Sequence, residues 1–423
     1  MLRIFCKMPT RGRAALTVGL SLLCALPACA QSSGDDGALP AWQFAGYGSA
    51  GVVHSSEKAA DFTANVLNPG RAGYSRLYSY DVDSRLAGQL NFSMTPAWSA
   101  VLQVVVERNM GHDFSPAIEW ANLSYRYSPE LSVRVGRIAL PVFLLAEYRK
   151  ASYALPWVRP PVEVYFALPL SSSDGIDASY RWRAGGAHNV TQVSLGRTSV
   201  RLSDTARFRG RELLALSNTV TLDALTVRAS VLTNRLEVDV ARPLFNAFAQ
   251  FGPAGQALAD KYDASSKRTA VATLGFNYDP GHWFLMGEIG RFNAHSFLGN
   301  KSVAYLSSGV RYGAFTPYAS YATSRANQST TEAGLALTGL APQAAARASF
   351  LNAQLNVLLS KIAVQHTSSV GVRWDFMPDR SLKLQYDRLR PDGGTSGTLI
   401  NVQPSFQSGH PVHALSAMLD VVF

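Results

Sequence analysis

The stretch VGVRWDFMPD, residues 370–379, contains the pattern that decides the fold. Its even positions from 370 to 376 carry Val, Val, Trp and Phe, and the odd positions between them carry Gly, Arg and Asp. Successive side chains of a β-strand point to opposite faces of the sheet, so this strand has one apolar and one polar face. The Pro378-Asp379 pair that follows predicts a tight turn. The pattern indicates an antiparallel strand whose two faces meet different surroundings.

The same alternation continues in other parts of the chain. It is regular over residues 78–92, 131–136 and 176–183, where the polar positions include Asp and Arg. Two segments depart from it, because the residues around Trp283 and around Tyr318 are too uniformly apolar or mixed to assign a face. Repeated strands of this kind predict a sheet with one apolar face and one face in contact with water.

Short and long connections alternate strictly along the chain. Seven short ones are marked by turn residues at 95–96, 128–130, 185–186, 223–224, 279–281, 313–314 and 378–379. Eight long ones lie at about 54–73, 109–116, 138–175, 200–210, 236–267, 293–302, 326–365 and 391–411. We therefore expect an all-β fold, a transmembrane antiparallel β-barrel of about sixteen strands with short periplasmic turns and long extracellular loops. A soluble sandwich offers no reason for every second connection to be long.

Aromatic residues stand beside six of the seven tight turns, as at Trp98, Trp182 and Trp374. In a barrel they would form a girdle at one membrane interface. Ordinary strand propensity is the alternative explanation, but the concentration next to turns favours the girdle. The last strand alternates up to Phe423, and a terminal Phe in that position resembles the signal read by the barrel-assembly machinery. We expect Phe423 to be that assembly signal.

The first thirty residues predict an export signal, and residues 31–423 a single barrel domain. Arg3, Lys7, Arg11 and Arg13 precede a short apolar region, and Ala-Cys-Ala at 28–30 offers a cleavage site. A lipoprotein box ending at Cys29 is the alternative, so cleavage and lipidation both remain open, with cleavage favoured. The rest of the chain has no apolar stretch of about 20 residues, and only 16% of residues are charged, which suits a barrel in the outer membrane of a Gram-negative bacterium.

Several kinds of chemistry are excluded by composition. All three cysteines lie in the first thirty residues, so the remaining chain has no thiol for disulfides, metals or nucleophilic catalysis. The eight histidines are scattered without metal-ligand spacing, and neither a nucleophile elbow nor a phosphate-binding glycine loop is present. Basic residues are not clustered as nucleic-acid binding requires. We expect no catalytic, metal or cofactor site and no nucleic-acid partner.

The third long connection is the most unusual one. Around it, residues 135–165 contain VGRIALPVF, EYR, ALPWVRPP and EVY. This sequence resembles the third-loop region of proteobacterial sixteen-stranded porins, in which that loop folds into the barrel and narrows it. The resemblance implies a passive, water-filled channel, usually a homotrimer. The Pro-Glu-Phe-Gly-Gly signature of enteric general porins is absent, so their constriction residues cannot be transferred one by one.

The residues themselves support an inward loop. A barrel of about sixteen strands leaves an aqueous lumen, and a 38-residue connection stiffened by prolines is too long for a simple loop. Folded inward, it would bring five charged residues to the narrowest point. These are Glu147, Arg149, Lys150, Arg159 and Glu163. The alternative is an external loop whose charges are solvated.

Alternation assigns a second set of charged residues to the lumen wall, because an Arg facing lipid at the bilayer midplane costs roughly 2–4 kcal/mol. The set is Asp81, Asp83, Arg85, Arg126, Arg134, Asp177, Arg181, Arg183 and Arg373. Basic residues outnumber acidic ones in it, so we expect a mild anion preference.

Together these patterns predict a porin for passive diffusion of small hydrophilic solutes and ions, with outer-membrane lipid as its surroundings. A surface adhesin or receptor barrel is the first alternative, and an outer-membrane barrel enzyme is the less favoured one, since no serine partner can be nominated for His282 or His295. The loop segments 242–262 and 341–362 are expected to be partly helical, either over the mouth or against a neighbouring subunit. The sequence leaves the solute, the pore size and the oligomeric state open.

Overall fold

The structure is a computed structural model that describes residues 41–203 and 206–423. The predicted export signal at 1–30, with Cys29, lies outside the described residues. Among the described residues, no helix is both long enough and apolar enough to cross a membrane.

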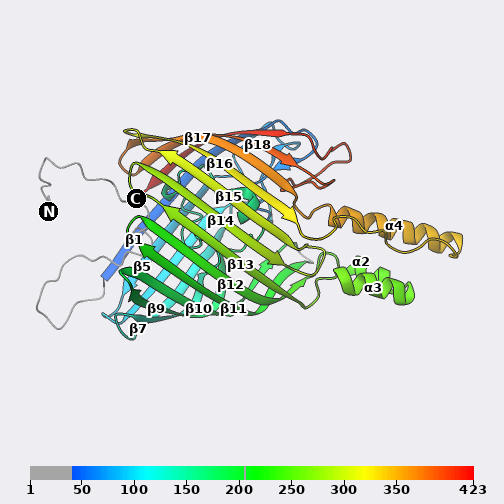
Figure 1. The fold of residues 1–423 in the computed structure, drawn as a ribbon, viewed down its shortest axis with the longest axis horizontal. Coiled ribbons are helices and arrows are strands. Elements are labelled where there is room, and N and C mark those ends of the chain that lie inside the picture. The colour runs from blue at the N-terminus through cyan, green and yellow to red at the C-terminus, as the bar shows by residue number, and fades with distance from the viewer. Residues whose placement is uncertain (1–40, 204–205) are drawn as a thin grey trace, which may run out of the picture.

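Sixteen antiparallel strands form one closed barrel (Figure 1). They are β1 (Ala41–Ser55), β5 (Arg85–Ser93), β6 (Trp98–Glu107), β7 (Pro116–Arg126), β8 (Leu131–Ala139), β9 (Ser172–Ala184), β10 (Ala187–Arg201), β11 (Arg207–Leu222), β12 (Leu225–Val238), β13 (Lys267–Tyr278), β14 (Trp283–Asn293), β15 (Lys301–Val310), β16 (Phe315–Ala326), β17 (Gln365–Met377), β18 (Arg380–Pro391) and β19 (Val412–Val422). The barrel closes where β1 pairs with β19, from Tyr47 opposite Val422 to Ser55 opposite Ala414.

The connections are arranged as predicted. All seven tight turns gather at one end of the barrel with the C-terminus, and the long loops lie at the other end (Figure 1). The fold prediction of a sixteen-stranded antiparallel barrel is confirmed. Seven of the eight long connections agree with the expected ranges to within a few residues, and the first one does not.

The first loop is longer than predicted, and the predicted strand over 78–92 is wrong at its beginning. Three two-residue strands lie in this loop, β2 (Asp61–Phe62), β3 (Ala72–Gly73) and β4 (Tyr78–Ser79), and the barrel strand begins only at Arg85. Residues 81–83 are buried one after another, which an alternating strand does not allow. The chain turns inward here, and Ser84 Oγ accepts a hydrogen bond from Gly51 N at 3.0 Å. Asp81 and Asp83 are therefore loop residues and not strand residues of the wall.

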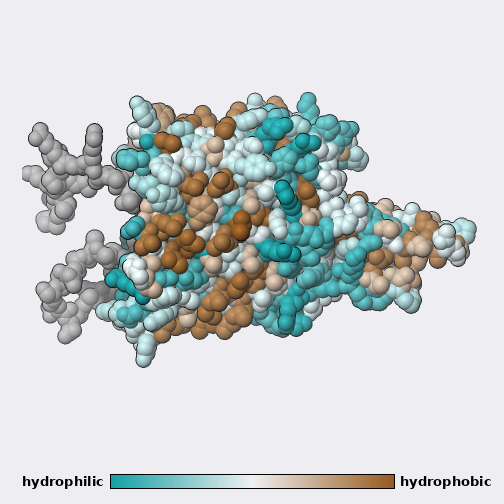
Figure 2. Space-filling model, in the orientation of Figure 1, coloured by the Kyte–Doolittle hydropathy of each residue, from teal (hydrophilic) through white to brown (hydrophobic). Residues whose placement is uncertain are grey.

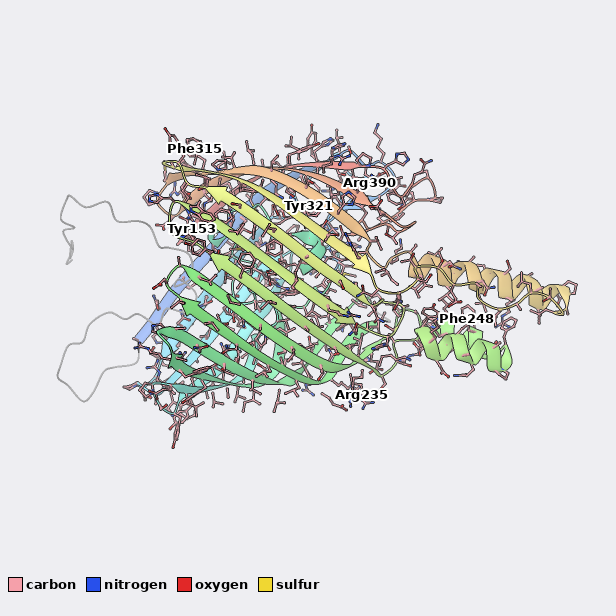
Figure 3. All side chains as sticks on the ribbon, in the orientation of Figure 1. Tyr153, Arg235, Phe248, Phe315, Tyr321 and Arg390 are labelled. Atoms are coloured by element: carbon pink, nitrogen blue, oxygen red, sulfur yellow. The ribbon has the colours of Figure 1, made fainter. Side chains whose placement is uncertain are left out.

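The outer face of the barrel is apolar over a broad belt. Figure 2 shows hydrophobic side chains gathered on the part of the wall nearer the short turns, and hydrophilic ones toward the long loops. In Figure 3, Phe315 marks the first end, and the exposed Arg235 and Arg390 lie toward the second. The wall therefore extends beyond its apolar belt on the loop side.

Aromatic side chains contact one another at the short-turn end. Trp98 lies 4.6 Å from Tyr125 between ring centroids, and Phe315 stacks on Trp374 at 5.7 Å. Each of these rings is exposed on the outer face. This is the geometry that an interfacial girdle requires.

In the part of the chain that the structure describes, helices occur only in the loops. Besides a short turn at Ser152–Ala154 and α1 (Val162–Tyr165), they are α2 (Arg242–Ala249), α3 (Gly252–Tyr262) and α4 (Pro342–Leu359). The last three project away from the barrel along its axis (Figure 1) and pack on one another around Phe245, Phe248 and Leu355. They extend beyond the loop end of the barrel (Figure 1).

We predict that a methyl group at Gly46 will destabilise barrel closure. A Cβ there would lie 2.3 Å from the Phe423 ring and 2.9 Å from the Ala87 carbonyl oxygen, and the backbone oxygen cannot give way. Gly46→Ala should lower the free energy of unfolding by about 1–3 kcal/mol, measured by urea titration of the refolded barrel in vesicles. Gly88→Ala is the matched control, because its Cβ would have no neighbour closer than 3.4 Å. Equal stability of the two variants would contradict the prediction.

Candidate functional site

The third loop, residues 140–171, lies inside the barrel. Most of its apolar side chains are buried, and Leu145 and Trp157 are exposed by 1% or less. They pack against inward-facing residues of β11 to β16, such as Leu213, Leu232 and Phe284. One side of the lumen is therefore filled by an apolar contact between loop and wall.

This contact explains the two segments whose alternation could not be read. On β14, Phe284 and Met286 face inward and are buried beneath the loop, while Trp283 is exposed on the outside. Tyr318 on β16 is buried in the same way. A wall strand that contacts lipid on one face and an apolar loop on the other does not need a polar face, so its sequence does not alternate clearly.

Hydrogen bonds fix the loop to the same side of the wall. Glu288 on β14 accepts the backbone N–H of Leu144 at 2.7 Å and the hydroxyls of Tyr165 and Tyr305. The indole N–H of Trp157 donates to Ser307 Oγ at 2.8 Å. The loop is thus held by directional bonds as well as by apolar packing.

Charged residues fix the other edge of the loop to β17, β18 and β19. Arg159 binds both carboxylate oxygens of Asp83, at 2.9 and 2.6 Å, and reaches Asp387 at 2.9 Å. Glu163 accepts hydrogen bonds from Gln365, at 2.6 Å, and from Thr367. Arg159 and Glu163 line one recess together, and each is buried to 3% exposure or less.

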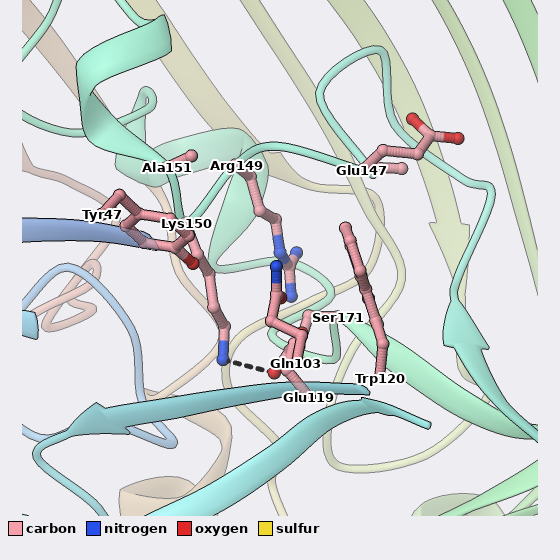
Figure 4. Close-up of a pocket in the computed structure, with 10 residues that line it drawn as sticks. Tyr47, Gln103, Glu119, Trp120, Glu147, Arg149, Lys150, Ala151 and Ser171 are labelled. Atoms are coloured by element: carbon pink, nitrogen blue, oxygen red, sulfur yellow. Dashed lines mark hydrogen bonds and ion pairs between the residues drawn. The ribbon is translucent and has the colours of Figure 1, made fainter. Parts of the chain in front are cut away.

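The remaining three predicted loop residues meet at a different recess. Glu147 forms a bidentate pair with Arg228 of β12 at 2.8–3.0 Å. Lys150 bonds Glu107 at 2.6 Å and Glu119 at 2.8 Å. Arg149 donates to the carbonyl oxygen of Pro169 at 3.0 Å. Figure 4 shows Arg149 and Lys150 extending from the loop toward strands β6 and β7.

A β-bulge on β7 shapes this recess. Gln103 of β6 pairs with Trp120 and Val104 with Ile118, so Glu119 is an extra residue. Paired residues share a face, so Trp120 faces inward like Gln103, and the bulge turns Glu119 inward as well. Ile118 is exposed on the outer face. Two neighbouring side chains therefore line the recess, which a regular strand does not permit.

The structure separates the predicted wall residues into paired and free ones. Arg134 binds Asp177 at 2.5 Å, and Arg373 binds the carbonyl oxygens of Tyr153 and Leu155 in the loop. Arg85 lies 3.9 Å from Glu107, beside the recess of Lys150.

A second group is exposed and forms no side-chain bond with any described residue. It consists of Arg126, Arg181 and Arg183 on β7 and β9. Asp81 binds Arg71 at 2.7 Å and lies 3.3 Å from Arg108.

Sequence reasoning missed most of the partners of the third loop. Glu107, Glu119, Arg228, Glu288, Lys383 and Asp387 are the largest omissions. Polar positions on the inner face of each strand were the available signal. Their partners lie in a loop distant in sequence, so the pairing itself left no local pattern.

The arrangement narrows the lumen with a loop whose charged residues are paired with residues of the wall. Within 41–203 and 206–423, no three His, Cys, Asp or Glu side chains are placed to hold a metal ion. The paired charges set local fields along the lumen.

Comparison with known proteins gives structural likeness only. No protein-family model matches the chain, and no curated protein matches it. The solved structures that share its fold include the outer-membrane channel DcaP of Acinetobacter baumannii (10% identity, TM-score 0.52, covering 91% of this chain and 98% of that one), the anion-selective porin of Comamonas acidovorans (11%, 0.51, 91% and 100%) and Salmonella typhi OmpF in complex with daunomycin (12%, 0.52, 90% and 97%). The fold is that of sixteen-stranded outer-membrane porins.

We predict opposite effects of neutralising two loop carboxylates. Burial raises the pKa of Glu163, so the folded barrel disfavours the ionised carboxylate. The barrel therefore loses stability as pH rises above about 4.3, the ordinary pKa of a Glu side chain in the unfolded chain. Glu163→Gln should therefore stabilise the barrel at pH 8 more than at pH 4. For Glu147, burial alone would raise the pKa, but the charge and hydrogen bonds of Arg228 lower it.

Glu147→Gln should destabilise the barrel by roughly 3 kcal/mol at pH 8, because Arg228 is left buried without its counter-ion. Its pair contributes stability above the unfolded carboxyl pKa and loses it as pH falls. Urea unfolding followed by tryptophan fluorescence at both pH values measures each variant. The same sign for both at pH 8 would disprove the assignment.

Proposed function

We propose that the chain is an outer-membrane porin of a Gram-negative bacterium, through which small hydrophilic solutes and ions diffuse passively. The observation that carries the proposal is a closed barrel whose outer wall is apolar and whose lumen is narrowed, on one side, by the internal third loop. An apolar exterior suits lipid, and a lumen lined by polar residues on β7 to β10 suits water. The export signal at 1–30 would direct the chain across the inner membrane.

The proposal includes a mild anion preference. Most predicted constriction charges have partners of opposite sign, so their fields largely cancel at a distance. The exposed Arg126, Arg181 and Arg183 have no such partners among the described residues, and they stand on the wall away from the loop. The likeness to an anion-selective porin is of fold alone and supports this only indirectly.

The proposal also takes the protein to be a homotrimer, assembled with Phe423 as the recognition signal for the barrel-assembly machinery. Phe423 pairs through its backbone with Gly46, at 2.7 and 3.0 Å, so the last residue closes the barrel. We propose neither an enzymatic activity nor a cofactor for this chain. A surface receptor is the second candidate, favoured by the projecting α2, α3 and α4.

Planar-bilayer recording of the refolded protein tests the proposal. Stepwise conductance in groups of three is the result expected of a trimeric channel. Single steps would contradict the trimer and leave the proposed channel in place. A well-folded barrel that produces no conductance would overturn the channel and favour the receptor.

We predict that the three free arginines set the ion preference. Replacing Arg126, Arg181 and Arg183 together by Gln should shift the reversal potential in a KCl gradient toward cation selectivity, because three uncompensated positive charges leave the wall. Replacing the paired Arg209, Arg211 and Arg242 by Gln, near the loop end, is the control with the same change of net charge. An equal shift in both variants would show that total charge, and not the position on the wall, decides selectivity.

A further inference from the structure

We propose that the arm formed by α2, α3 and α4 docks onto the arm of a second copy of this chain in a facing outer membrane, with the two α4 helices antiparallel. The contact joins two cell surfaces and does not depend on the proposed channel. The arm extends beyond the loop end of the barrel and points along the barrel axis (Figure 1). In outer-membrane barrels the long loops face the cell exterior, so the arm points away from the cell.

Helix α4 is apolar on two opposite faces. One face, which includes Leu355, is buried in the apolar cluster that joins the three helices. The opposite face carries Phe350, exposed by 62%, and Val357, exposed by 55%. Helical spacing places two exposed alanines on the same line, so the outer stripe of α4 consists of Ala346, Phe350, Ala353 and Val357. A helix that is apolar all round is normally buried on all sides, and hydrophobic side chains are visible along the arm in Figure 2.

The outer stripe is complementary to itself when two copies are antiparallel. Along α4 its residues are small, large, small and large in turn. In an antiparallel pair centred between residues 351 and 352, Phe350 lies opposite Ala353 of the second copy, and Ala346 lies opposite Val357 of the second copy. A parallel pair instead places Phe350 against Phe350 and leaves space at the alanines. Apolar surfaces pack best without voids or overlap, so the order of sizes favours the antiparallel pair, an isologous contact with two-fold symmetry.

The charge of α4 favours the same orientation. The helix carries one charged side chain, Arg347, which donates to Gln250 Oε1 at 2.6 Å and lies 6.0 Å from the centroid of the Phe251 ring. These contacts direct the guanidinium toward α2 and away from the outer stripe. In the antiparallel pair the two Arg347 residues lie about 13 Å apart along the axis, which exceeds the Debye length of about 8 Å at physiological salt. A parallel pair places them at the same level.

The antiparallel orientation identifies where the second copy lies. Two barrels in one membrane have the same orientation, so their arms are parallel. A copy in a facing membrane presents its arm in the opposite direction, as the outer stripe requires. Four residues on each helix form a smaller contact than a standard interface of roughly 1,200–2,000 Å², so a single pair binds weakly. Many copies on each surface bind together through multivalency.

Disulfide trapping between two populations of vesicles tests the contact. Residues 31–423 contain no cysteine, so a single cysteine can be placed in each refolded barrel. One population carries Ala346→Cys and the other Val357→Cys, each with its own fluorescent label, and the two are mixed under mild oxidation. We expect a mixed dimer and no dimer from either population alone. Equal positions of an antiparallel pair lie about 16 Å apart along the axis, and a disulfide needs Cα atoms within about 7 Å.

Two results of the trapping experiment would overturn the proposal. Dimers formed within one population would show that neighbouring arms are parallel. Absence of the mixed dimer, while both cysteines react with a maleimide, would show that the outer stripes do not meet.

Clustering of vesicles that carry the cysteine-free barrel, followed by light scattering, is the second measurement. Ala353→Glu should reduce clustering about tenfold or more, because it places a charge against the apolar ring of Phe350 in the second copy. Gln354→Glu is the matched control, since it adds the same charge at the next exposed position, about 100° around the helix, and should leave clustering unchanged. Equal clustering by the two variants would overturn the proposal. Clustering with vesicles that contain no protein would also overturn it, because the arm would then bind lipid.

Discussion

Closure of the sheet between β1 and β19 is the constraint on which the rest of the structure depends. In lipid, a backbone N–H or C=O without a partner costs several kcal/mol, so a strand edge cannot be left open. The two terminal strands meet through nine consecutive residue pairs, and the backbone of Phe423 adds two more hydrogen bonds to Gly46. Glycine at position 46 gives the terminal ring its space beside the Ala87 carbonyl. Local packing at one seam therefore completes the hydrogen-bond network of the whole barrel.

The width of the barrel makes the third loop necessary. A wall of sixteen strands encloses more space than its own side chains can fill, and the loop fills part of it. Its apolar residues cover β11 to β16, and its charged residues meet carboxylates on the opposite edge. Burying ions such as Arg159 and Lys383 brings a desolvation cost, but each has a defined partner geometry. The apolar contact and the ion pairs hold the loop together, and the ion pairs fix where it lies.

The sequence was sufficient to predict the barrel but not the contacts between the third loop and the wall inside the lumen. Strand period and turn chemistry are local properties, so Pro378-Asp379 and Gly185-Gly186 could be located from the chain alone. The start of the barrel strand at Arg85 could not be predicted. The polar residues at 81 and 83 and the apolar residue at 82 continue the alternation of the strand, although the chain turns inward there. The contact of Glu147 with Arg228 joins residues 81 positions apart and leaves no local trace. The bulge at Glu119 is likewise defined by pairing and not by composition.

The positions of the charges say more about selectivity than their number does. Counting basic residues at the predicted constriction gives an excess, but Arg159 lies between two carboxylates and Lys150 between two more. A cation held this close to its counter-ions has a weak field at the distance of a passing solute. In the proposed channel, the field along the pathway would then be set by the arginines on β7 and β9 that the loop does not contact. Under this proposal, the loop would affect selectivity indirectly, because its contacts neutralise some wall charges and leave others in water.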